Sequence, residues 1–193
     1  YNTSHFTITC IGGQDNPGQD ATITPILSDD EIRIILTWGP TPYDLDSHLT
    51  GPLEDGSRFH MYFPFSGEYS PWPDVVTLDL DDVTSYGPET VTLYYQINGI
   101  YRYSVHDYSN RYSSTSTSLS NSGAVVRVYS GSALIAAFPV PTNQGGTLWT
   151  VFELNGPQIL PVNEFSYETT PYEVQLTNGL QLSEEQRAVS KKN

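Results

Sequence analysis

Short runs of alternating or β-branched apolar residues recur along almost the whole chain, and turn residues separate them. Such runs predict β-strands, because alternate side chains of a strand face opposite sides of a sheet. The predicted strands cover residues 5–10, 21–27, 31–38, 58–63, 75–80, 89–97, 100–106, 124–129, 133–140, 147–154 and 158–162. Many short strands with Gly- and Pro-containing turns favour an all-β fold, an antiparallel β-sandwich with long loops.

Two turn motifs predict how some of these strands pair. Asn98-Gly99 separates the strands 89–97 and 100–106, and this dipeptide suits the two-residue turn of a β-hairpin. Residues 129–133, with Gly131 at their centre, predict a second hairpin. Residues 141–146 contain two glycines, a proline and an asparagine, and are expected to form a loop.

The two ends of the chain are expected to lie outside the sandwich. Residues 12–19 have the Gly-, Asn- and Pro-rich composition of a linker. The predicted organisation is therefore a segment 1–19, a β-sandwich domain 20–180 and a tail 181–193. Residues 182–189 suit either a short C-terminal helix that begins after Ser183 or a disordered tail.

Charge excludes several classes of partner. The 193 residues include 8 Lys and Arg against 22 Asp and Glu, a net charge of −14. Nucleic acids and anionic lipid surfaces bind clustered basic residues, so neither is an expected partner. No apolar run approaches the roughly 20 residues of a membrane span, and membrane insertion is not expected. The abundance of Ser, Thr, Tyr, Asn and Gly suits an extracellular bacterial module, monomeric within a larger chain.

Carboxylates gather in two places. Asp44, Asp46 and His48 alternate with other residues, so their side chains share one face of an extended segment, and Asp79 and Asp81 do the same. Leu45 and Leu80 are then expected to point into the core. Like charges this close repel one another unless a cation lies between them. Ca²⁺, which takes six to eight oxygen ligands in irregular geometry, suits such a cluster. The alternative is that these acids are solvated residues at strand ends.

The histidines and tryptophans allow less specific interpretations. His48, His60 and His106 can be drawn around a Zn²⁺ ion, but their spacing matches no zinc motif, and hydrogen-bonded structural roles are favoured. Paired carboxylates also occur in glycosidases, yet no acid here is marked as the protonated partner. Trp38 and Trp149 lie in apolar strands and are expected in the core, whereas Trp72 is expected to be exposed.

Four strings of the sequence resemble the YfaP-like domain family. They are residues 33–52, 78–90, 99–109 and 148–152, and together they extend the similarity over about residues 31–162. The nearest functional analogue is the calcium-dependent peptide-binding domain of large bacterial surface adhesins. Residues 1–10 resemble the last strand of a carboxypeptidase-regulatory-like β-sandwich repeat, which often precedes such domains.

The resemblance implies a β-sandwich, a Ca²⁺ cofactor and a set of site residues. The implied calcium ligands are Asp44, Asp46, Asp79, Asp81 and Asp82, with Glu89 as a weaker candidate. The residues expected to line the ligand pocket are His48, His106, Asp107, Tyr108 and Tyr86. The implied partner is the free C-terminal end of a surface protein, and the implied place is the bacterial cell surface.

These observations predict a non-enzymatic, calcium-dependent adhesin module that captures the C-terminal end of a partner peptide. Two alternatives stay open at this point. One is a calcium-dependent carbohydrate-binding module with a glycan partner. The other is a structural spacer that bound Ca²⁺ makes rigid.

Overall fold

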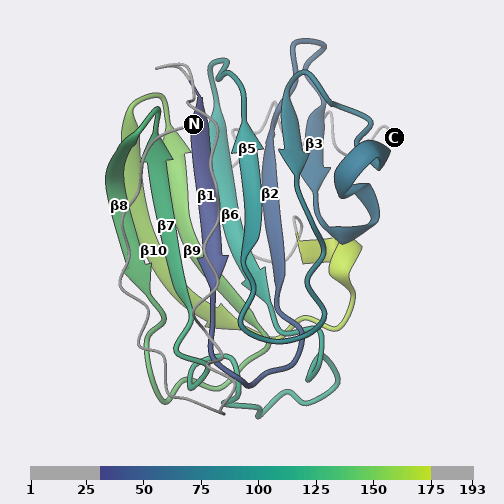
Figure 1. Ribbon diagram of the computed structural model, residues 1–193, viewed down its shortest axis with the longest axis vertical. Coiled ribbons are helices and arrows are strands. Elements are labelled where there is room, and N and C mark those ends of the chain that lie inside the picture. The colour runs from purple at the N-terminus through teal and green to yellow at the C-terminus, as the bar shows by residue number, and fades with distance from the viewer. Residues whose placement is uncertain (1–30, 175–193) are drawn as a thin grey trace, which may run out of the picture.

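The computed structural model describes residues 31–174 and shows two facing β-sheets (Figure 1). Each sheet contains five strands, and every paired strand is antiparallel to its neighbour. This confirms the predicted all-β sandwich. The predicted strands 5–10 and 21–27, the tail and the outer boundaries of the domain lie outside the described residues.

The ten described strands follow one another along the chain, with three single-turn 3₁₀ helices between or after them. Their bounds are β1 Ile32–Thr37, β2 Asp46–Pro52, β3 Arg58–Met61, η1 Phe63–Phe65, η2 Gly67–Tyr69, β4 Val76–Leu78, β5 Glu89–Leu93, β6 Ile100–His106, β7 Val125–Ser130, β8 Ala133–Pro139, β9 Leu148–Asn155, β10 Gln158–Ser166 and η3 Pro171–Glu173.

The first sheet has the strand order β4-β5-β1-β7-β8, and the second has the order β10-β9-β6-β2-β3. The hairpin predicted at residues 129–133 is confirmed, because β7 pairs with β8 around Gly131. The hairpin predicted at Asn98-Gly99 is wrong. The strands on its two sides, β5 and β6, belong to different sheets, so this turn lies in a connection that crosses the sandwich.

The core forms where the alternating apolar side chains of the two sheets meet. Ile34 and Leu36 of β1 and Leu49 of β2 are fully buried in it, and so are Tyr103 and Val105 of β6. Trp38 and Trp149 also lie in the core, as predicted. Trp72 is half-buried and packs against the core, so its expected exposure is only partial.

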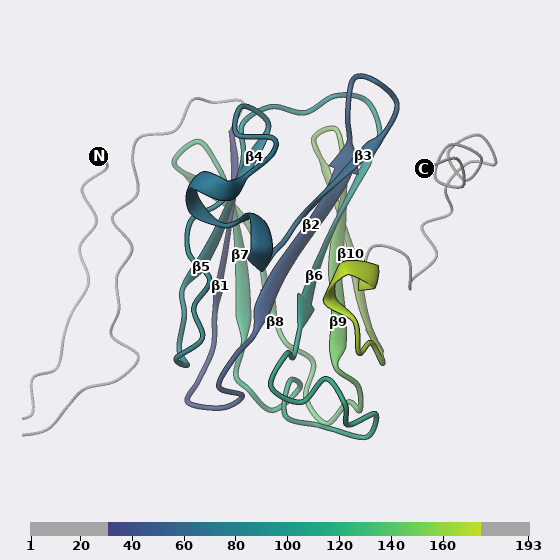
Figure 2. The same cartoon turned by 90° about the vertical axis from the view of Figure 1, so that its right-hand side faces the viewer.

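The outer side of the second sheet is partly covered by the chain after β10. Leu49 of β2 and Tyr103 and Val105 of β6 point into the core, so the residues next to them in each strand point outward. Figure 2 shows η3 and the segment before it beside β6 and β9 on this outer side. A hydrogen bond of 3.0 Å between His106 Nε2 and the main-chain oxygen of Glu168 joins this covering segment to β6.

The strand β2 was not predicted from the sequence. Its seven residues are Asp-Ser-His-Leu-Thr-Gly-Pro, with a single large apolar side chain, Leu49. Propensity alone does not favour a strand here. The segment is nevertheless buried along almost its whole length, because β6 and β3 pair with it on both sides.

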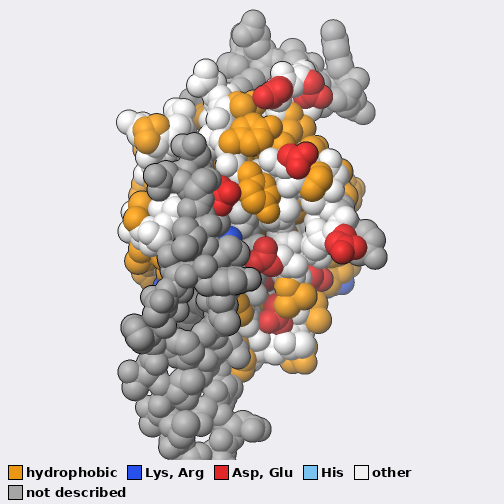
Figure 3. All heavy atoms as spheres, turned by 45° about the horizontal axis from the view of Figure 1, so that its top comes forward, with side chains coloured by type: hydrophobic (Ala, Val, Ile, Leu, Met, Phe, Trp, Pro, Cys, Tyr) orange, Lys and Arg blue, Asp and Glu red, His pale blue; other side chains and the backbone are white. Residues whose placement is uncertain are grey.

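On the face of the molecule that Figure 3 shows, acidic residues do not form a single patch. In the part of Figure 3 that is not grey, acidic side chains are scattered among apolar ones, and Lys and Arg are rare. Among the described residues, no helix has the length and apolar character needed to cross a membrane.

Gly51 in β2 offers a direct test of how tightly the second sheet is packed. A Cβ atom there meets the Tyr101 ring at 2.3 Å and the Phe59 ring at 2.6 Å. We therefore expect Gly51→Ala to lower the free energy of unfolding by about 1–3 kcal/mol through overpacking. Urea denaturation measures this change.

Gly145→Ala is the matched control, since a Cβ atom at this position has no other group of the described chain within 4 Å. This variant should stay within about 0.5 kcal/mol of the unaltered chain. Equal destabilisation by the two substitutions would contradict the packing described for β2.

Candidate metal centre

Three carboxylates from two separate stretches of the chain meet at one end of the sandwich. Asp46 opens β2, Asp44 lies two residues before it, and Asp81 lies in the connection between β4 and β5. One carboxylate oxygen from each of them lies within 4.8 Å of the other two. We call these three residues the acidic cluster. It brings together residues next to the first sheet and residues of the second.

The oxygens of the acidic cluster have no donor to satisfy them. Oδ1 of Asp44, Oδ2 of Asp46 and Oδ1 of Asp81 are buried and make no hydrogen bond within the described residues. A buried carboxylate oxygen without a donor costs free energy that a proton or a cation restores. The cluster therefore presents buried oxygen acceptors that can bind a proton or a cation.

Burial and mutual repulsion both act on these acids. Burial, followed by the nearby charges of Asp46 and Asp81, raises the pKa of Asp44 from 3.8 to about 7. Burial also raises the pKa of Asp46 and the pKa of Asp81. Arg111 acts in the opposite direction on Asp44 and Asp46, because its guanidinium charge favours their ionised forms. Near neutral pH, Asp44 of the ion-free cluster is thus only partly ionised.

Glu89 connects the acidic cluster to both sheets. It opens β5 in the first sheet, and its side chain is fully buried. Its Oε2 accepts a hydrogen bond of 2.6 Å from the main-chain N–H of Ser47 in β2, and its Oε1 accepts one of 3.4 Å from the N–H of Asp82. Burial, with the charge of Asp46 next, raises the pKa of Glu89 well above its usual value.

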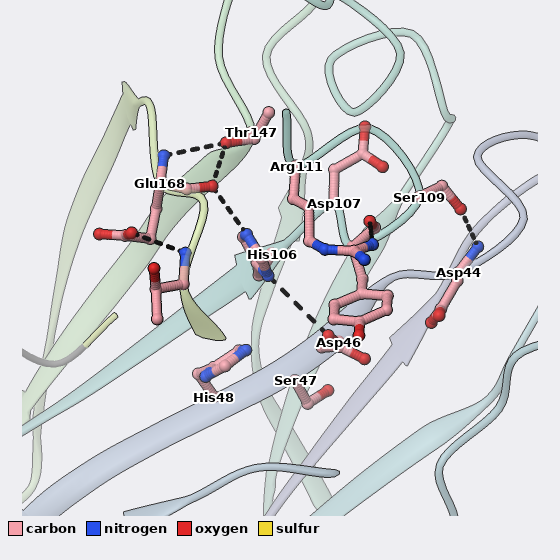
Figure 4. A network of polar contacts seen from close by, with 12 residues as sticks. Asp44, Asp46, Ser47, His48, His106, Asp107, Ser109, Arg111, Thr147 and Glu168 are labelled. Carbon is pink, nitrogen blue, oxygen red and sulfur yellow. Dashed lines mark hydrogen bonds and ion pairs between the residues drawn. The ribbon is translucent and has the colours of Figure 1, made fainter. Parts of the chain in front are cut away.

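A second group of possible ligands shares Asp46. One donor atom each from Asp46, His48 and His106 lies within 4.8 Å of the others, and all three residues are buried. We call them the histidine cluster. Figure 4 shows His106 between Glu168 and Asp46, with His48 beside them. The described residues thus contain acidic and histidine groups able to hold a metal ion.

The other predicted calcium ligands occupy different places. Asp79 is exposed and lies outside both clusters. Asp82 accepts hydrogen bonds from the N–H and the hydroxyl of Thr84, so its Oδ1 stabilises the local turn. Leu80, expected in the core, is 59% exposed. Residues 79–81 are not in a strand, so the alternation assumed for them does not apply.

The predicted pocket residues divide in the same way. His48 and His106 lie in the histidine cluster, whereas Asp107 caps a turn by accepting from the N–H and the Nδ2 of Asn110. Tyr108 packs under the guanidinium of Arg111, at 3.8 Å from ring centroid to Cζ. Tyr86 serves the main chain: its carbonyl accepts from Trp38 N–H at 3.1 Å.

Several residues around the clusters carried no recognisable signal in the sequence. Ser109 Oγ accepts from the N–H of Asp44 at 2.9 Å, Arg111 supplies positive charge, and the Glu168 carbonyl accepts from His106. Ser109 and Arg111 lie in a Ser-rich loop, and Glu168 acts through its main chain. Only the folded chain brings them to the site.

Comparison with known proteins gives the fold alone. No protein-family model and no curated protein matches the chain. A homologue of telluride resistance protein (TerD) from Streptomyces coelicolor A3(2) is similar in structure, with 18% identity and a TM-score of 0.54 over 72% of this chain and 92% of the other. A protein of unknown function, SAV2460, gives 17% identity and a TM-score of 0.49 over 75% and 94%.

The similarity to the TerD homologue overturns the functional expectation drawn from the sequence. The matching fold is that of a TerD homologue and not that of an adhesin domain. The prediction of an adhesin module that captures the C-terminal end of a peptide is therefore wrong, together with the cell-adhesion role attached to it. The resemblance to the YfaP-like family is not tested by these comparisons and stays a prediction.

The raised pKa of Asp44 gives a pH-dependent stability that can be measured in chelator. Between about pH 4 and pH 7, folded Asp44 keeps a proton that the unfolded chain has lost, since its pKa moves from 3.8 to about 7. Raising the pH through this window then destabilises the fold. Relative to the Asp44→Asn variant, the unaltered chain should lose stability in urea denaturation as the pH rises.

Asp55→Asn is the control of opposite sign. Hydrogen bonds from the hydroxyl and N–H of Ser57 lower the pKa of Asp55, so its contribution is present above its unfolded pKa and is lost on acidification. Comparison with variants cancels the titration of the histidines, which is common to all three proteins. An unaltered chain that gains stability relative to Asp44→Asn as the pH rises would contradict the site electrostatics.

Proposed function

We propose that this chain is a calcium-binding β-sandwich domain whose ion is held by the acidic cluster. The observation that supports this most directly is the convergence of Asp44, Asp46 and Asp81, each with a buried oxygen that has no hydrogen-bond donor within the described residues. A divalent cation supplies the missing positive charge to all three at once. Burial is the main cause of the raised pKa of Asp44, and the charges of Asp46 and Asp81 add to it; a cation offsets both effects.

The donor atoms favour Ca²⁺ over other divalent ions at this cluster. All three donors are carboxylate oxygens, which hard cations prefer. Two of them, Asp44 and Asp46, come from one segment and the third, Asp81, from a distant one, and Ca²⁺ accepts irregular arrangements that Mg²⁺ does not. Main-chain carbonyls and water commonly complete the six to eight ligands of such an ion.

The surrounding charges support cation binding as well. The chain carries a net charge of −14, and this negative field raises the local concentration of cations. Glu89 and Asp107 add buried carboxylates near the cluster. Arg111 is the positive group that acts on Asp44 and Asp46, and it offsets only part of this charge.

The proposed consequence of binding is mechanical. Asp46 belongs to the second sheet, and Asp81 lies next to β4 and β5 of the first. An ion shared by them joins the two sheets where Glu89 already connects them through hydrogen bonds. The proposed role is binding without catalysis. An extracellular location, where calcium reaches concentrations suited to weaker sites, stays a prediction.

Calcium should stabilise the fold in proportion to its binding. A ligand that binds only the folded state adds RT ln(1 + [L]/Kd), which is about 2.7 kcal/mol at a hundredfold excess over Kd. We expect the melting temperature in millimolar CaCl₂ to exceed that in excess EDTA, and re-addition of Ca²⁺ to restore it. Coinciding melting curves in the two buffers would reject calcium as the ion.

Substitutions within the acidic segments locate the ion. Asp81→Asn removes a donor of the cluster and should weaken Ca²⁺ binding, measured by calorimetry, by at least about tenfold, or 1.4 kcal/mol. Asp79→Asn, two residues away and exposed, is the matched control and should change the affinity little. Equal losses for the two variants would mean that the ion does not lie where Asp81 meets Asp44 and Asp46.

A further inference from the structure

We propose a second metal site, for Zn²⁺ or another late first-row divalent cation, formed by Asp46 Oδ2, His48 Nε2 and His106 Nδ1. These three atoms are buried and have no hydrogen-bond partner within the described residues. They belong to the histidine cluster, whose donors lie within 4.8 Å of one another. The inference goes beyond calcium binding and does not rest on it.

Strand register brings the three side chains together. Asp46 of β2 lies directly opposite His106 of β6, and His48 follows Asp46 by two residues on the same outer face. Asp46 Oδ2 is 3.9 Å from His106 Nδ1. The whole group is buried, with Asp46 2%, His48 1% and His106 0% exposed. The position of the donors is therefore set by paired strands and not by a loop.

The hydrogen bonds of His106 leave its Nδ1 free to bind a metal. Its Nε2 lies 3.0 Å from the Glu168 carbonyl oxygen, which only accepts, so Nε2 carries the proton. In the neutral ring, Nδ1 then presents its lone pair toward Asp46 and His48 (Figure 4). Thr147 Oγ1 also donates to the Glu168 oxygen at 2.8 Å and accepts from the Glu168 N–H, which holds that carbonyl in place.

A second series of hydrogen bonds, through His60, sets the tautomer of His48. Its Nδ1 lies 2.9 Å from His60 Nε2. The other ring nitrogen of His60 donates its proton to the main chain at Tyr172. His60 Nε2 is then an acceptor, His48 Nδ1 is the donor, and His48 Nε2 keeps its lone pair. Partners of this kind orient metal-binding histidines in known sites.

Three converging acceptors distinguish a metal site from a buried water. With the His106 tautomer that the Glu168 carbonyl sets, Asp46 Oδ2, His48 Nε2 and His106 Nδ1 all accept. A proton between Asp46 and His106 satisfies the contact between those two residues and leaves His48 Nε2 without a donor. A water molecule has two protons and satisfies two of the three. A divalent cation satisfies all of them.

The donor set suits zinc. Two nitrogens with one carboxylate oxygen are typical ligands for Zn²⁺ and its neighbours in the first transition row. In a tetrahedral site with ligands about 2.0–2.1 Å from the ion, two ligands lie about 3.4 Å apart. Asp46 Oδ2 and His106 Nδ1 are 3.9 Å apart, so they must approach by about half an ångström when the ion binds. A fourth position stays open for water or a further oxygen.

The test uses the full chain, stripped of metal with chelator and then held in excess Ca²⁺ to fill the acidic cluster. Calorimetric titration with ZnCl₂ should show one site per chain. His48→Gln and His106→Gln should each lower the Zn²⁺ affinity by at least about tenfold. Asp81→Asn removes no donor of the histidine cluster, so Zn²⁺ binding should persist in it with a much smaller change in affinity than in the two histidine variants, whether or not calcium binding is lost.

Two controls cover adventitious binding and misfolding. His5→Gln alters the fourth histidine of the chain, outside the described residues, and should have no effect. If the variants do not fold by circular dichroism, Co²⁺ added to the unaltered chain should shift the ring-proton resonances of His48 and His106 most strongly. Zn²⁺ binding that survives both histidine variants in folded form, disappears with Asp81→Asn or His5→Gln, or fails to occur would overturn the proposal. So would Co²⁺ shifts confined to other residues.

Discussion

A buried carboxylate that receives main-chain hydrogen bonds from opposite sheets is the constraint on which the site depends. Glu89 begins β5, yet its oxygens accept from Ser47 in β2 and from Asp82 in the connection after β4. Ser47 separates Asp46 from His48, and Asp82 follows Asp81. One side chain thus sets the position of the segments that carry both candidate metal groups. The bonds offset part of the cost of burying this carboxyl group.

The same arrangement leaves an excess of hydrogen-bond acceptors and negative charge at this end of the sandwich. Acceptors converge there from Asp44, Asp46, Asp81, His48 and His106, while the donors of the surrounding main chain are already engaged. The raised pKa values of Asp44 and Asp81 show that the fold disfavours their ionised forms, and protonation relieves only part of this cost. A cation removes this penalty without any change in the backbone. The fold therefore provides a reason for metal binding that surface acidity alone does not.

Local sequence patterns were sufficient for most of the fold and for part of the site. Alternation predicted β1 and β6 closely because their inward residues are large and apolar. It failed for β2, whose burial comes from neighbouring strands and not from its own composition. The i and i+2 rule brought Asp46 and His48 to one face, but it misplaced Asp79 because residues 79–81 are not extended in a sheet.

The rest of the site depends on contacts between distant segments, which no local pattern contains. The register of β2 against β6 places His106 opposite Asp46, although the two residues are far apart in the chain. The tautomer of His106 depends on the carbonyl of Glu168, which any residue type would supply. Histidine spacing along the sequence therefore gave no zinc motif, although the strands bring two histidines together.

The shared carboxylate of Asp46 links the two proposed ions thermodynamically. Two cations near one carboxylate repel each other, and each draws electron density from the same group, so electrostatics alone makes the second ion bind more weakly. Against this, the first ion fixes Asp46 and removes the cost of ordering it for the second. Whatever the net sign, the coupling is reciprocal: the factor by which calcium changes zinc affinity equals the factor by which zinc changes calcium affinity. The surrounding carboxylates of Glu89 and Asp107 reduce the repulsive part, since they keep the pair of sites negative when one ion is present. The buried acids around Asp46 would thus favour the binding of both proposed ions at one strand end.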